Sequence, residues 1–311
     1  MNMTQITASA VKELRERTGA GMLDCKKALE ENNADMDASI DYLRQKGLAK
    51  AAKKAGRVAP EGLVSVAVKG KFAVAIELNA ETDFVARNEQ FQKFLTELTE
   101  IALNNSITNV EDLKAASMNG TTVDAALSAL IATIGENMTL RRVESVSVDN
   151  GTVADYMHSA IVPGKGKIGV LVGLKTSSTN TEKLAELGRK LAMHVAAANP
   201  IALTTASIDQ DVVARERAIY AEKAKESGKP ENIIEKMVEG SLRKFYEQVV
   251  LMEQTYIIDG ETKISEVLKQ AEKELGAPVE ISSYVRLELG EGVEKKEENF
   301  AEEVNKVACG C

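Results

Sequence analysis

The fold is decided by the stretch Val64-Ser-Val-Ala-Val-Lys-Gly-Lys-Phe-Ala-Val-Ala-Ile-Glu-Leu78, in which apolar residues recur at every second position. A period of two is typical of strands, whose side chains point alternately to opposite faces of a sheet. The turn Lys69-Gly70-Lys71 separates the two alternating runs. The stretch therefore predicts an antiparallel hairpin with one buried face.

A helix is expected after this hairpin, and the same order of elements recurs later in the chain. The apolar side of the first helix is formed by Phe91, Phe94, Leu95, Leu98, Ile101 and Ala102. In the second copy, a Gly-Lys turn at 164–167 leads into the alternating residues 168–174, and a helix follows over 182–198. We interpret this as a weak internal repeat, each copy placing a helix on one face of an antiparallel sheet, which predicts the α+β class.

Helical segments flank and separate the two copies. Residues 7–56 have the pattern of three short helices, the third ending at Gly47, and residues 122–142 have the pattern of another helix. A charged helical hairpin at about 211–250 has only a thin apolar seam, so it is expected to project from the core. These patterns divide the chain into a helical module with its linker, two core halves, and a charged tether with a one-sided terminal helix, at residues 1–56, 57–145, 146–290 and 291–311.

Composition excludes several classes of protein. The net charge of −8 argues against a chain whose main task is to bind phosphate backbones. Two histidines and three cysteines without ligand spacing predict no metal site and no cofactor. The sparse, odd cysteine count fits a reducing cytoplasm, and the absence of a long apolar run predicts neither a signal peptide nor a membrane span.

Gly164-Lys-Gly-Lys-Ile-Gly169 matches the dinucleotide-binding pattern G-x-G-x-x-G. That pattern binds pyrophosphate only where a helix follows the glycines, and here a strand pattern follows. We therefore interpret it as a hairpin turn. His194, on the apolar side of a predicted helix, is interpreted as a core histidine. With no assembled catalytic site, the sequence favours a binding or regulatory protein over an enzyme.

A basic run at 44–57 contains six lysines and arginines and no acidic residue. Two interpretations remain open from the residues alone. The run is either a solvated helical linker between domains or a stripe that contacts RNA. The negative net charge argues against direct nucleic-acid binding as the main activity.

Short motifs along the chain occur in a recognisable order. They begin with Val11-Lys-Glu-Leu-Arg-Glu-Arg-Thr-Gly-Ala-Gly-Met-Leu-Asp-Cys-Lys-Lys-Ala-Leu29 and Thr82-Asp-Phe-Val-Ala86, and continue with Ile134-Gly-Glu-Asn137, Arg141-Arg-Val143, Ala192-Met-His-Val-Ala-Ala197, Lys236-Met-Val-Glu-Gly240 and Gly290-Glu-Gly-Val293. In this order the chain resembles bacterial elongation factor Ts over nearly its whole length. The resemblance implies a ubiquitin-associated-like helical module, two related α+β core halves, a protruding helical hairpin and a short C-terminal docking helix.

The resemblance also implies a function. The family binds elongation factor Tu in its GDP-bound form, disturbs the Mg²⁺ and phosphate site and promotes GDP release during translation elongation. When two ligands of one protein each weaken the binding of the other, a single coupling free energy describes both effects. Mg²⁺ is a sensitive target, because it requires nearly ideal octahedral geometry.

By the same resemblance, the residues that disturb the Mg²⁺ site are Thr82, Asp83, Phe84 and Val85. Phe84 would enter between helices of the partner's GTPase domain, and Asp83 would make polar contacts beside it. A rigid aromatic on a short loop carries a large contact area at low entropic cost. From the residues alone there is an alternative: Thr82 or Asp83 caps the next helix, and Phe84 fills the hairpin core.

Further partner contacts are implied at Arg15, Met22 and Leu23 in the helical module, at His158, and at Phe300 in the terminal helix. The family commonly has methionine where Leu23 stands. This chain also has extra residues between His158 and the next strand, at 161–165, and a Cys309-Gly-Cys311 tail that matches nothing in the family.

Three other interpretations remain. A ubiquitin-associated-type adaptor would use only the helical module. An RNA-binding accessory factor would use residues 44–57, and a nucleotide-binding enzyme would use residues 164–169. Self-association into a homodimer is also left open.

Overall fold

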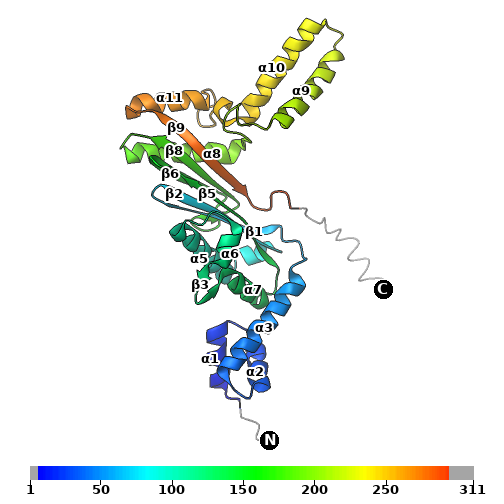
Figure 1. Cartoon of the computed structure of the whole chain (residues 1–311), viewed down its shortest axis with the longest axis vertical. Helices are drawn as coiled ribbons and strands as arrows, with labels where there is room; N and C mark the ends of the chain where they lie inside the picture. Colours follow the sequence, from blue (N-terminus) through cyan, green and yellow to red (C-terminus); the bar gives the residue numbers. More distant parts are fainter. Residues whose placement is uncertain (1–5, 294–311) are drawn as a thin grey trace.

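A computed structural model of the chain describes residues 6–293. Two antiparallel sheets pack face to face, and helices cover the outer face of each (Figure 1). A small helical module lies at one end of this core, and a helical hairpin projects at the other (Figure 1). The predicted α+β class is confirmed. The proposed terminal helix with Phe300 lies outside the described residues.

The first sheet contains the predicted hairpin. Its strands have the order β5-β2-β1-β7, and β1 pairs with β2 from Glu61 opposite Ala80 to Lys69 opposite Phe72. Their bounds are β1 Glu61–Lys69, β2 Phe72–Ala80, β5 Met138–Ser147 and β7 Lys165–Gly166. The prediction that only one face of the hairpin is buried is wrong, because helices cover one face and the second sheet covers the other.

The outer face of the first sheet packs on helices between β2 and β5. Leu63 and Ile76 face α5, whose buried residues match the predicted apolar side except that Thr99 replaces Ile101. The connecting elements are α5 Glu89–Asn105, α6 Val110–Ala115, the short hairpin β3 Ser117–Met118 and β4 Thr121–Thr122, and α7 Val123–Ile134.

The second sheet repeats the plan, as predicted. Its strand order is β6-β8-β9, and its outer face packs on α8 and α11. The bounds are β6 Gly151–His158, β8 Ile168–Thr176, α8 Thr181–Ala198, α11 Ile264–Leu275 and β9 Val279–Glu288. On the inner face of β8, a Cβ at Gly169 would lie 2.7 Å from Val64 Cγ1, and one at Gly173 would lie 2.9 Å from Val146 Cγ1. These two glycines therefore allow the sheets to approach closely.

The helical module contains three helices, but the end predicted for the third is wrong. The bounds are α1 Ala8–Thr18, α2 Met22–Glu31 and α3 Met36–Lys54. Gly47 does not end α3, since it is buried in the helix where a Cβ would come within 3.4 Å of Ala132 on α7.

The helix predicted over 122–142 stops at Ile134, because Gly135 adopts a left-handed conformation (φ 92°), and β5 begins three residues later.

The projecting hairpin agrees with the prediction. It consists of α9 Gln210–Lys225 and α10 Glu231–Val249, followed by the 3-10 turn η1 Leu251–Glu253. A narrow seam of Ala224, Val238 and Leu242 holds the two arms together. Figure 1 shows the arms extending away from both sheets.

The extra residues at 161–165 connect the two sheets. Residues Val162 to Lys165 form a turn, and the N–H of Val66 donates to the carbonyl of Gly164 at 3.0 Å. Strand β7 then pairs along β1, with Gly166 opposite Val64. The loop between two strands of the second sheet thus covers the edge of the first, which protects β1 from pairing with another chain. The glycine pattern at 164–169 is a turn followed by a strand, as predicted.

A buried ion-pair cluster joins the first sheet to the end of β9. Glu77 is fully buried and accepts hydrogen bonds from Arg141 Nη1 at 3.0 Å, from Arg142 Nε, and from the N–H of Gly290 at 2.8 Å. Consecutive strand residues normally point to opposite faces, but the pairing of β2 with β5 shifts here, so that Arg141 is a bulged residue. Both arginines can therefore reach one carboxylate.

Replacing Glu77 by alanine should lower the free energy of unfolding by about 3 kcal/mol, because both arginines lose the carboxylate that they share. The matched control is Glu144→Ala, on an exposed position of β5, where we expect a change below about 0.5 kcal/mol. Urea unfolding measures both. Equal effects of the two substitutions would show that the buried cluster contributes nothing specific.

Candidate functional site

The loop after β2 exposes one aromatic side chain. Phe84 lies in the short helix α4 (Asp83–Ala86) and is 79% exposed, whereas Val85 and Ala86 are buried in the core between the first sheet and its helices. The alternative in which Phe84 fills the hairpin core is therefore wrong. Thr82 occupies the N-cap position of α4, but its side chain makes no capping hydrogen bond, and Asn88 rather than Thr82 or Asp83 caps α5.

Two carboxylates fix the base of this loop by a reciprocal exchange of hydrogen bonds. The N–H and the hydroxyl of Thr82 donate to Glu136, at 3.0 and 2.8 Å. In return, the N–H of Asn137 donates to Glu81 at 2.5 Å, and the Asn137 side-chain amide donates to the carbonyl of Arg57 at 2.7 Å. Hydrogen bonds to ionised acceptors are among the stronger ones in proteins. The turn between α7 and β5 therefore holds the entry to the loop.

Glu81 and Glu136 are functional candidates that sequence reasoning missed. In the sequence, the motif Ile134–Asn137 stands out only as a member of the ordered series. Its role depends on contact with residues about 54 positions earlier, such as Thr82. No local pattern indicates such a contact. The available signal is that each of the two distant motifs has an acidic residue in it or directly beside it, Glu136 in one case and Glu81 in the other.

Asp83 places a carboxylate next to the exposed aromatic ring. Its side chain is about half exposed and lies 3.8 Å from Arg87, one helical turn on. An ion pair this exposed contributes little stability, so the carboxylate can exchange Arg87 for another partner at little cost. Within residues 6–293, no group of three or more His, Cys, Asp or Glu side chains is arranged to hold a metal ion. The loop can contact a surface through the exposed side chains of Asp83 and Phe84.

The helical module presents a second set of predicted residues. Leu23 is 85% exposed and Met22 is 56% exposed at the start of α2, while Arg15 is exposed on α1. The module's own core is formed instead by other apolar residues, among them Leu14, Cys25 and Leu29. Met22 therefore faces solvent, although its spacing from Cys25 and Leu29 is typical of one helix face.

His158 lies at the exposed end of β6, in a third part of the fold. Its Nδ1 is 3.3 Å from the hydroxyl of Tyr156, and the inserted loop follows directly. The predicted site residues thus come from the loop after β2, from the helical module and from the edge of the second sheet. Phe300 lies outside the described part of the chain.

Most basic side chains of the run at 44–57 bind other groups of the same chain. Lys46 and Lys50 both bind Asp24, at 2.9 and 3.0 Å. Lys54 donates to the carbonyl of Gly135, and Arg57 lies 3.4 Å from Glu81. Most of the run belongs to α3, which agrees with the predicted helical linker, although several of its cations bind groups of the same chain. The interpretation as an RNA-binding surface is weakened accordingly.

His194 is a core histidine, as predicted. It is fully buried on α8, with Nε2 3.0 Å from the Gln254 side-chain oxygen and Nδ1 accepting the N–H of Ile257. This pattern requires the neutral ring with its proton on Nε2. Burial lowers the pKa of His194, although the hydrogen bond with Gln254 opposes the shift.

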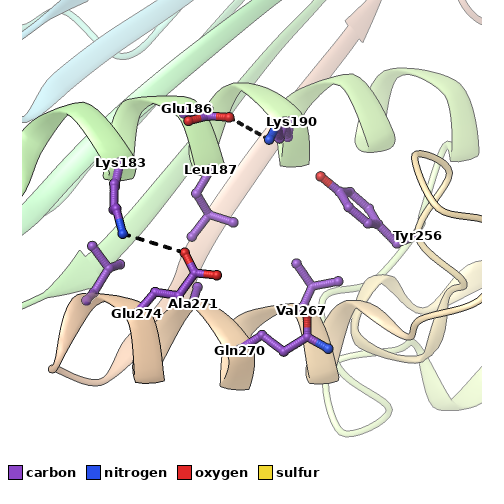
Figure 2. Close-up of a pocket in the computed structure, with 10 residues that line it drawn as sticks. Lys183, Glu186, Leu187, Lys190, Tyr256, Val267, Gln270, Ala271 and Glu274 are labelled. Atoms are coloured by element: carbon purple, nitrogen blue, oxygen red, sulfur yellow. Dashed lines mark hydrogen bonds and ion pairs between the residues drawn. The ribbon is translucent and has the colours of Figure 1, made fainter.

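The groove between α8 and α11 is a separate feature. It has a volume of about 230 Å³, and its walls include Leu187, Val267 and Tyr256 (Figure 2). Its rim is charged, with Lys190 bound to Glu186 at 2.6 Å and Lys183 3.8 Å from Glu274. None of the site residues predicted from the sequence lines this groove.

The fold and the loop together define an α+β protein that presents an exposed aromatic side chain on a firmly held loop. This loop does not line the groove between α8 and α11. The sequence model of a family described as Elongation factor TS matches residues 81–291. Elongation factor Ts of Rhodospirillum rubrum is 56% identical over 305 residues, covering 97% of this chain and 98% of the relative. Elongation factor Ts of Rickettsia bellii is 51% identical over all of both chains.

The chain belongs to the elongation factor Ts family. Membership implies a nucleotide exchange factor for elongation factor Tu in translation elongation. Among the helices of residues 6–293, none combines the length and the apolar character that a membrane span requires.

The unfolding free energy should fall as pH is lowered from about 7.5 to 5.5. An unfolded histidine takes up a proton near pH 6.5, but the folded protein keeps His194 neutral to lower pH, since its pKa is lowered. The unfolded state then binds more protons, so stability is lost below the unfolded pKa. His194→Gln should flatten this pH dependence, and His158→Gln, at an exposed position, should leave it intact. Urea unfolding across the pH range tests both, and an unchanged slope in His194→Gln would contradict the assignment.

Proposed function

We propose that the chain binds elongation factor Tu in its GDP-bound form and promotes GDP release by inserting Phe84 between helices of the partner's GTPase domain. The insertion displaces the groups around the partner's Mg²⁺ and phosphates. The observation that carries this proposal is the 79% exposure of Phe84 on a loop that is anchored on both sides. Burying an exposed phenylalanine is worth about 2 kcal/mol.

The effect on GDP follows from the coupling between two ligands of one protein. If the exchange factor lowers the affinity of elongation factor Tu for GDP, then GDP lowers the affinity of elongation factor Tu for the exchange factor to the same extent. Each tenfold change corresponds to about 1.4 kcal/mol. Mg²⁺ tolerates little departure from octahedral geometry. A bulky side chain that displaces the groups around Mg²⁺ therefore uses the free energy of partner binding to lower the affinity for GDP.

The four loop residues take different roles in this proposal. Phe84 and Asp83 contact the partner, because both side chains are exposed. Thr82 and Val85 hold the loop, since Thr82 binds Glu136 and Val85 is only 4% exposed. This division refines the expectation that all four residues contact the partner.

Contacts outside the loop would hold the two proteins together. The exposed side chains of Arg15, Met22 and Leu23 offer one such contact, and His158 offers another. We assign to them binding rather than displacement of Mg²⁺, because they lie on different elements from the Phe84 loop. Self-association and a cytoplasmic location stay predictions.

Phe84→Ala should fold normally and lose most of the exchange activity, by about tenfold or more, because the loss of about 2 kcal/mol falls on the step that expels GDP. The measurement is release of a fluorescent GDP analogue from elongation factor Tu at catalytic amounts of the chain. The matched control is Ile258→Ala, another exposed apolar side chain in a loop. GDP release at the parental rate with Phe84→Ala would disprove the role of the loop.

Leu23→Ala should affect binding more than turnover. Its side chain is 85% exposed, and loss of a contact made equally before and during GDP release raises KM without lowering kcat. We expect KM to rise about threefold to tenfold, corresponding to roughly 1 kcal/mol of apolar contact. A ubiquitin-associated-type adaptor would instead lose all partner binding with Leu23→Ala and keep it with Phe84→Ala.

A further inference from the structure

We infer that Glu136 is a positioning residue for nucleotide exchange: its carboxylate fixes the backbone that enters the loop and so sets the direction in which Phe84 points. The inference rests on the proposed function, because it concerns how the same aromatic side chain is held. It adds a residue on a different segment of the chain, the turn between α7 and β5.

The first observation is an unused helix cap. A threonine at an N-cap normally accepts a hydrogen bond from an N–H two or three residues further on. Thr82 accepts no such bond; its hydroxyl donates to Oε1 of Glu136 at 2.8 Å, and its N–H donates to Oε2 at 3.0 Å. Both donors of one residue converge on one carboxylate. The entry to the loop is therefore fixed by a distant segment and not by its own helix.

The second observation is that Glu136 is itself firmly held. Gly135 ends α7 in a left-handed conformation, and its carbonyl accepts a hydrogen bond from Lys54. Asn137, on the other side, donates its N–H to Glu81 at 2.5 Å. The backbone is thus fixed on both sides of Glu136, which keeps its carboxylate within reach of Thr82.

The third observation concerns the ring. Because Phe84 is 79% exposed, side-chain packing within the chain contributes little to its direction. The buried Val85 and Ala86 fix the backbone after it, and Thr82 fixes the backbone before it. Removal of the Glu136 carboxylate takes away both hydrogen bonds of Thr82, so that the entry to the loop is held only through Glu81 and the end of β2. The ring would then sample several directions, few of which fit a partner.

The experiment measures kcat and KM for release of a fluorescent GDP analogue from elongation factor Tu. Glu136→Ala should lower kcat about tenfold, as expected for the loss of hydrogen bonds to a charged group, with little change in KM. Glu136→Gln, whose amide oxygen still accepts, should be intermediate. The matched control is Glu111→Ala, an exposed glutamate on α6, which should keep the parental kinetics.

A double-mutant cycle with Phe84→Ala separates positioning from a general loss of folded protein. If Glu136 acts through the ring, adding Glu136→Ala to Phe84→Ala should cause little further loss. An equal further loss in that background would overturn the inference, as would full activity of Glu136→Ala while Phe84→Ala is inactive. Full activity of Phe84→Ala would instead overturn the proposed function, whatever the result with Glu136.

Discussion

The face-to-face contact between the two sheets is the constraint on which the rest of the structure depends. The sheets meet through valines of the first sheet and glycines of β8, where a Cβ at Gly169 would lie 2.7 Å from Val64 Cγ1. Burial of both inner faces requires helices on both outer faces, because each strand has apolar side chains on its two sides. Polar groups at the margin of the contact must then be paired, as Glu77 is by Arg141 and Arg142.

Elements with a local pattern could be predicted from the sequence, and elements that depend on distant partners could not. The hairpin at 61–80, α5, α8 and the projecting pair of helices follow from periodicity and turn residues. Strand β5 was hidden, because its two central arginines look like surface residues until Glu77 is placed beside them. In the sequence Gly47 is typical of a helix end, but its missing side chain allows α3 to pack closely against α7.

The candidate site also has a part that follows from a local sequence motif and a part that depends on distant residues. The resemblance singled out Phe84, and its exposure agrees with a contact residue, but the burial of Val85 could not be foreseen from a four-residue motif. Glu136 acts on Thr82 across 54 positions of sequence, and only the fold brings the two segments together. Sequence reasoning therefore identified what the loop presents, while the structure was needed to identify what holds it.

The rigidity of the loop decides whether a single aromatic side chain is sufficient for exchange. Ordering one free backbone residue costs about 1–2 kcal/mol, so ordering Asp83 and Phe84 on binding would cost about 2–4 kcal/mol. Burial of the phenylalanine returns only about 1.5–3 kcal/mol. With a free loop, little or nothing would remain to act against GDP. Because Glu136 and the buried Val85 fix the loop before binding, most of the free energy from the ring is left for displacing the groups around Mg²⁺.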